Sequence, residues 1–112
     1  MATKIGRLQR KVYEIGMIGS LAHNLARYEV MDSGAYSASE FLFAVRGYMA
    51  DRKVEPAQIN SWMKLVEAQA ANEHMYFLRN KQYANTAGGT AISIDALIGH
   101  ILDQLGYEGG ER

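Results

Sequence analysis

The first chemical question is whether the histidines and acids of this chain can hold a metal ion. The three histidines are His23, His74 and His100. Di-iron helical bundles place a glutamate three residues before a histidine so that both side chains face inward, and none of these histidines has a glutamate at that position. The chain also lacks cysteine and a His-x-x-x-His pair, so the usual zinc ligand spacings are missing. We therefore expect no metal site and no cofactor.

Residue patterns for covalent catalysis are missing as well. The chain has no Gly-x-Ser-x-Gly elbow and no cysteine to supply a thiolate. Gly88-Gly89-Thr90 lacks the Gly-Lys-Ser/Thr ending of a phosphate-binding loop and follows a helical segment rather than a strand. The acidic residues are scattered along the chain. The sequence thus predicts a protein that is not an enzyme.

Nucleic-acid binding is a more serious option because the start of the chain is basic. Its first eleven residues contain four cations and no acid: Lys4, Arg7, Arg10 and Lys11. On a helix, Lys4, Arg7 and Lys11 recur on one face with Arg10 alongside, which suits contact with phosphates. The polar side of any amphipathic helix has the same look, and the formal net charge of zero argues against a DNA-binding domain.

A second stretch with nucleic-acid character is Gln58-Ile59-Asn60-Ser61-Trp62-Met63. It resembles the start of the recognition helix in helix-turn-helix proteins, where an aliphatic residue and a Trp three positions later pin that helix onto its predecessor. The resemblance implies major-groove contacts from Gln58, Asn60, Ser61 and Lys64. The chain departs from the motif because the turn is one residue short and residues 52–54 replace the usual glycine. The alternative is that Trp62 anchors a core or an interface.

The positioning of all these residues depends on four segments of helical period. They are separated by breaks at residues 32–34, 53–56 and 85–90. We expect long helices over about 3–31 and 56–83, a shorter one after the capping box that starts at Ser37, and another from Ser93 to Gly106. The sequence therefore predicts an all-α, four-helix bundle-like domain over residues 1–107, followed by a flexible tail at 108–112.

The first segment predicts self-association. Ile5, Leu8, Val12 and Ile15 recur at the spacing of a coiled-coil seam, which Gly19 and Ala22 continue with small residues. We expect the second half of this helix to be buried on two sides, and the unpaired lengths of the long helices to leave apolar surface that a symmetric dimer covers. The alternative is a helix that bends near residues 16–19 and packs on its own chain. The expected interface residues are Ile5, Leu8, Val12, Ile15, Gly19, Ala22, Trp62, Tyr76 and Tyr83.

Composition narrows the class of protein further. With 112 residues, 48% of them hydrophobic, and no cysteine, the chain suits one globular domain in a reducing compartment, and we expect a cytoplasmic protein. No apolar run approaches the ~20 residues of a membrane span, so we expect no membrane partner. The predicted function is that of a regulator, adaptor or inhibitor of bacterial or phage type, which binds a protein partner as a homo-oligomer.

Two alternatives to that function stay open. One is a helix-turn-helix DNA-binding regulator that uses the basic and polar residues given above. The other is a helical bundle that binds a small anionic ligand between subunits, with guanidinium groups as clamps. The candidate clamps are Arg27, Arg46 and Arg79.

Overall fold

Four helices account for nearly all of the chain that the computed structural model describes, which is residues 6–30, 38–79 and 94–107. They are α1 (Arg7–Val30), α2 (Ala38–Asp51), α3 (Pro56–Arg79) and α5 (Ile94–Leu105). These described ranges contain no strand. The prediction of an all-α fold is confirmed, and the described residues contain two long and two shorter helices. The predicted capping residues Ser37 and Ser93, the loop at residues 88–90 and the tail at 108–112 lie outside the described residues.

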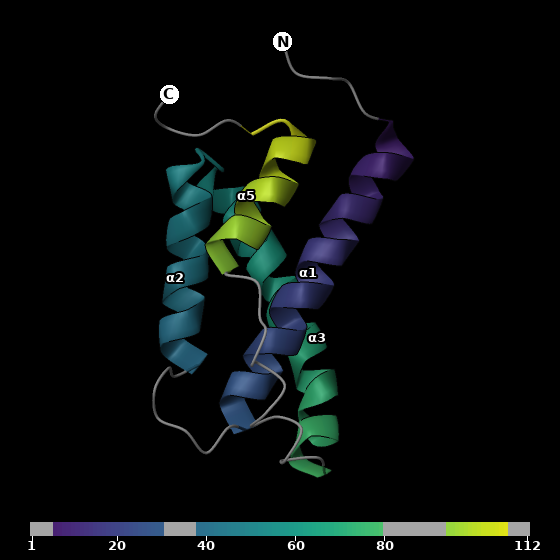
Figure 1. Cartoon of the computed structure of the whole chain (residues 1–112), viewed down its shortest axis with the longest axis vertical. Coiled ribbons are helices and arrows are strands. Elements are labelled where there is room, and N and C mark those ends of the chain that lie inside the picture. The colour runs from purple at the N-terminus through teal and green to yellow at the C-terminus, as the bar shows by residue number, and fades with distance from the viewer. Residues whose placement is uncertain (1–5, 31–37, 80–93, 108–112) are drawn as a thin grey trace.

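The two long helices, α1 and α3, lie side by side and run in the same direction, while α2 and α5 run in the opposite direction (Figure 1). His23 on α1 contacts Glu73 on α3, a separation of 50 residues. Gly19, one turn earlier, faces Gln69 at the same separation, with 3.6 Å from its Cβ position to Nε2. A constant offset over successive turns means that α1 and α3 keep one register along this contact.

The second half of α1 is buried on two sides, as predicted. Its buried apolar side chains are Met17, Ile18, Leu21, Ala22, Leu25, Ala26 and Val30. On one side Tyr28 packs against Phe41 of α2, with ring centroids 5.2 Å apart. On another, the His23 ring meets Phe77 of α3 edge-on at 4.9 Å. The small residues Ala22 and Ala26 allow these neighbours to approach closely, and together these contacts form the centre of the core.

Each of the other helices buries one stripe of apolar side chains. Helix α2 buries Phe41, Val45 and Met49. Helix α3 buries Ile59, Trp62, Met63, Val66, Ala70 and Phe77. Helix α5 contributes Ile98, Ile101, Leu102 and Leu105 to the same core. Each set recurs at intervals of three, four or seven residues, which places it on one side of its helix.

Two helix ends share one type of cap. At the end of α2, the Val54 amide donates to the Met49 carbonyl at 3.2 Å and the Lys53 amide to the Ala50 carbonyl at 3.0 Å. This is a Schellman motif, in which the penultimate residue takes a left-handed conformation. At α5 that residue is Gly106, with φ of 98°, as predicted, whereas at α2 it is Lys53, with φ of 68°. Pro56 begins α3, also as predicted.

A single arginine ties the α2–α3 turn to α5. Arg52 forms an ion pair with Asp103, and its Nη1 lies 2.8 Å from the position that a Cβ on Gly99 would occupy. The Arg52 Nε is buried without a hydrogen-bond partner among the described residues. The absence of a side chain at Gly99 thus leaves room for this guanidinium to cross α5.

Candidate functional site

Several exposed apolar side chains lie together on the first half of α1. Leu8, Val12 and Ile15 are 79%, 59% and 61% exposed, and their spacing of four and three residues places them on one face. Ile15 also lines a hollow of about 450 Å³ with Leu65 of α3, which is 51% exposed. We call Leu8, Val12, Ile15 and Leu65 the apolar strip.

The strip is exposed because this half of α1 is fixed to the protein through its other side. Arg10 donates from Nη1 to the carbonyl oxygen of Leu105 at 2.9 Å, and the Tyr13 hydroxyl donates to Oε1 of Gln104 at 3.3 Å. The Arg10 guanidinium also lies 6.0 Å from the centre of the Tyr107 ring. These contacts place α5 and its C-terminal end against one side of α1, and the apolar strip lies on another side.

The alternative in which this helix packs its seam on its own chain is not seen. Helix α1 is continuous through Gly16 and Gly19. A Cβ at Gly16 would meet nothing within 4 Å. The large exposure of the apolar strip shows that no described part of the chain covers it.

The structure divides the predicted interface residues into surface and core. Leu8, Val12 and Ile15 are exposed, as is Tyr76, and Gly19 is half-buried. Ala22 and Trp62 are corrected to the core, because they are 0% and 2% exposed and have no surface to offer a partner. Trp62 instead meets the Tyr107 ring edge-on at 6.1 Å. Ile5 and Tyr83 lie outside the described residues.

Sequence reasoning left some exposed apolar residues out of the site. Leu65 lies three residues from Trp62 on α3, and Phe43 is 81% exposed on α2 between the buried Phe41 and Val45. A signal for Phe43 was present, since it falls off the stripe that Phe41, Val45 and Met49 share. Met75 and Leu78 are also exposed near the end of α3.

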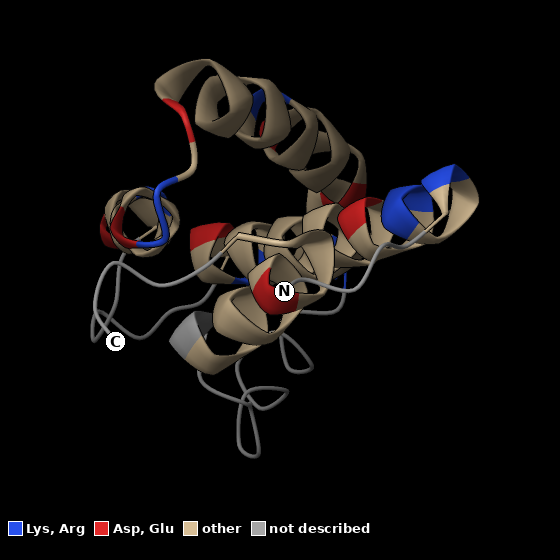
Figure 2. Cartoon of the chain, turned by 90° about the horizontal axis from the view of Figure 1, so that it is seen from above, with Lys and Arg blue, Asp and Glu red and all other residues tan. Residues whose placement is uncertain are grey.

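The predicted basic strip is only partly free. Arg7 and Lys11 are exposed, and they lie in the first turns of α1, where Figure 2 shows blue residues at the helix end. Arg10 donates to the Leu105 carbonyl and also pairs with Glu14, with 3.4 Å between the arginine Nε and the glutamate Oε2. It therefore holds α1 in place and is not free for phosphates. Lys4 lies outside the described residues.

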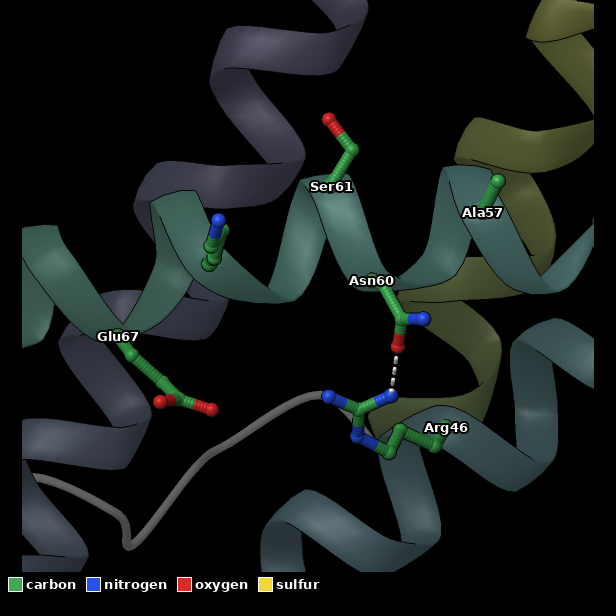
Figure 3. A pocket seen from close by; sticks show the side chains of 6 residues that line it. Arg46, Ala57, Asn60, Ser61 and Glu67 are labelled. Carbon is green, nitrogen blue, oxygen red and sulfur yellow. Dashed lines mark hydrogen bonds between the residues drawn. The ribbon is translucent and has the colours of Figure 1, made fainter.

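A second candidate site lies between α2 and α3. Arg46, Ala57, Asn60, Ser61, Lys64 and Glu67 line a hollow of about 520 Å³, which we call the α2–α3 hollow. Arg46 of α2 donates from Nη1 to Oδ1 of Asn60 at 2.8 Å. Figure 3 shows Asn60 and Glu67 on the side of α3 toward Arg46, and Ser61 and Ala57 pointing away from Arg46.

This hollow combines residues that the sequence placed in two different hypotheses. Arg46 was a predicted anion clamp, while Asn60, Ser61 and Lys64 were predicted to read bases. Gln58, predicted with them, is half-buried and does not line the hollow. Of the other clamps, Arg27 is corrected to the core, because it is 4% exposed with its guanidinium 4.8 Å from the Tyr28 ring centre. Arg79 is exposed at the end of α3 and lines no part of the hollow.

The helix-turn-helix resemblance has some local support. Ile59 and Trp62 are buried as that motif requires, and Lys53 has the positive φ that its turn glycine would adopt. However, the aromatic ring that Trp62 contacts belongs to Tyr107, which follows α5, and not to a residue of α2. This contact is not the packing on the preceding helix that the motif implies, and DNA binding stays a prediction.

Within the described residues, no group of three or more His, Asp or Glu side chains is placed to hold a metal ion. No described helix has the length and apolar character that crossing a bilayer requires. Comparison with known proteins finds no matching family model, no similar curated protein and no similar solved structure.

Proposed function

We propose that the chain is a non-catalytic binding protein whose four helices form a bundle, and that two copies associate through the apolar strip. In this form it acts as a regulator, adaptor or inhibitor of a macromolecular partner in the cytoplasm. The observation that carries the proposal is the exposure of Leu8, Val12 and Ile15 on successive turns of one helix face, beside Leu65. Exposed large apolar residues that form one patch mark association surfaces.

The size of the strip suits a reversible dimer. Burial of one aliphatic side chain is worth about 1.5–3 kcal/mol, so the partly exposed strip residues of two copies together contribute on the order of 10 kcal/mol. Association costs about 4–15 kcal/mol in lost freedom. Because these two quantities are similar, we expect a dimer that dissociates on dilution.

An antiparallel pairing of two α1 helices fits the surface best. With Val12 of one copy beside Ile15 of the other, Leu8 lies beside the half-buried Gly19 of the second copy, at the point where Gln69 of that copy packs against the glycine. The pairing ends there because Ala22, on the next turn, is buried inside its own protomer. The same surface serves on both copies, as a two-fold dimer requires.

Light scattering at tens of micromolar tests this proposal. The wild-type chain is expected at twice its monomer mass of 12.5 kDa, and Val12→Asp is expected at the monomer mass. Phe43→Asp is the matched control, because Phe43 is as exposed as Leu8 but lies on α2, so this variant remains dimeric. A monomeric wild-type chain, or equal effects of the two substitutions, would contradict the proposal.

A second candidate function is DNA binding through α3. It is supported by the exposure of Asn60, Ser61 and Lys64 just after the tight turn at Lys53. Fluorescence anisotropy with a labelled duplex at low salt tests it. DNA binding predicts an affinity that falls steeply as salt rises and that decreases in Lys64→Gln. The absence of any binding at low salt would remove this candidate.

A further inference from the structure

The α2–α3 hollow is rich in hydrogen-bond donors at one end. The guanidinium of Arg46 has five N–H donors, and among the described residues only one of them is used, from Nη1 to Oδ1 of Asn60. This bond fixes the guanidinium at the hollow. Lys64 follows Asn60 by four residues and so lies on the same face of α3, one turn further along. Two cations from different helices thus border one hollow, an arrangement that suits a phosphate group.

The other end of the hollow carries an acceptor. Glu67 follows Asn60 by seven residues, or two helical turns, and lines the same hollow. Figure 3 shows its carboxylate on the same side of α3 as the Arg46–Asn60 bond. Glu67 forms no ion pair with Arg46 or Lys64. A carboxylate in this place repels a second anion and accepts hydrogen bonds from hydroxyl groups.

We propose that the α2–α3 hollow binds a phosphorylated sugar or a similar hydroxyl-bearing phosphate ester. Arg46 and Lys64 hold the phosphate, Asn60 positions Arg46, and Glu67 accepts hydrogen bonds from the hydroxyls. The hollow is open to solvent, since all of its lining residues are exposed, and its volume is about 520 Å³, within the range of about 300–1,000 Å³ for small-molecule sites. The site is formed within one protomer and does not depend on the dimer.

The phosphate of a nucleic-acid backbone offers the same chemistry to Arg46 and Lys64, and Glu67 distinguishes the two sources. A sugar phosphate gains from the carboxylate because its hydroxyls donate to it. A nucleic-acid strand places a second phosphate near the same carboxylate and is repelled. Removal of this charge in Glu67→Gln therefore weakens binding of the sugar phosphate and strengthens binding of the nucleic acid.

An NMR titration of the ¹⁵N-labelled full chain tests the proposal, with ribose 5-phosphate, inorganic phosphate, ribose and a short DNA duplex as separate probes. Ribose 5-phosphate is expected to give saturable shifts of the amides around Arg46 and from Asn60 to Glu67. Arg46→Gln is expected to weaken this binding about tenfold, the loss of one charge-assisted hydrogen bond. Glu67→Gln is expected to weaken the binding of ribose 5-phosphate several-fold and to leave the affinity for inorganic phosphate unchanged or higher.

The control variant is Arg79→Gln, which removes an exposed arginine of α3 outside the hollow and is expected to change nothing. Thermal unfolding of each variant establishes that it is folded. Three results would overturn the proposal: no saturable shift with ribose 5-phosphate, shifts centred away from the hollow, or equal weakening by Arg79→Gln. Binding of the duplex alone, tightened by Glu67→Gln, would assign the site to nucleic acid instead.

Discussion

His23 on α1 and Glu73 on α3 are joined side chain to side chain, with 2.9 Å between Nδ1 and Oε1. A second contact has the opposite arrangement, since Nδ1 of His74 on α3 lies 3.2 Å from Oε1 of Glu29 on α1. Each long helix thus supplies one histidine and one glutamate to the other. These contacts lie along the same α1–α3 seam that brings Ile15 next to Leu65.

The first prediction concerns the energy of this contact. In a double-mutant cycle with His23→Gln and Glu73→Ala, we expect a coupling of about 0.5–1 kcal/mol, because both side chains are partly exposed and an ordinary hydrogen bond contributes about that much. Urea unfolding at neutral pH measures it. Since His23 also packs on Phe77, the single substitution of His23 costs more than the coupling. Strict additivity of the two substitutions would show that the contact contributes nothing.

The second prediction concerns the cap of α2. Lys53 has φ of 68°, and a residue with a side chain pays about 1 kcal/mol or more for this left-handed conformation. Lys53→Gly is therefore expected to raise the free energy of unfolding by about 0.5–1 kcal/mol. Lys53→Ala is the control, because alanine keeps the Cβ and the strain. Equal stabilisation by both variants would mean that the lysine side chain, and not the backbone conformation, is unfavourable.

The third prediction compares two glycines inside helices. A Cβ at Gly47 of α2 meets nothing within 4 Å, so Gly47→Ala is expected to stabilise the protein by about 1 kcal/mol through helix propensity. A Cβ at Gly99 of α5 falls 2.8 Å from Nη1 of Arg52, and that arginine is held by Asp103. Gly99→Ala is therefore expected to gain less than Gly47→Ala, or to destabilise.

Thermal or urea unfolding decides this comparison, and Arg52→Ala provides the control background. Without the guanidinium, Gly99→Ala is expected to recover the gain of Gly47→Ala. If Gly99→Ala stabilises the unaltered chain as much as Gly47→Ala does, Arg52 does not limit the space at α5.

The sequence predicts the parts of the fold that depend on local pattern. Helix α3 buries the stripe of Ile59, Met63, Val66, Ala70 and Phe77, and Gly106 caps α5. Both features are predictable because periodicity and capping depend on residues that are close together in the sequence. Trp62 was predicted at the interface, with a core position or a contact to the preceding helix of a helix-turn-helix motif as alternatives, and it lies in the core. Trp62 is buried whereas Leu65 is about half-exposed. This difference depends on how the other helices cover α3, and the pattern of one helix does not predict it.

The candidate sites depend on contacts between distant residues and are less predictable. Arg10 looks like a phosphate contact in the sequence, but it donates to Leu105, 95 residues away. Arg46 and Asn60 become partners only through the placement of α2 against α3. By contrast, the α1 part of the apolar strip follows from the sequence, because Leu8, Val12 and Ile15 recur at the spacing of a seam and are exposed, whereas Leu65 was not predicted.

Disulfide cross-linking between two copies tests the pairing of the apolar strip most directly. The chain has no cysteine, so Val12→Cys and Ile15→Cys each introduce one thiol into a protein that is otherwise inert to oxidation. When equal amounts of the two variants are mixed and oxidised, we predict that the disulfide between Val12→Cys and Ile15→Cys chains exceeds its random share, as intact mass measures. Phe43→Cys in place of Ile15→Cys is predicted to give no such excess. A random distribution of disulfides in both mixtures would contradict the account.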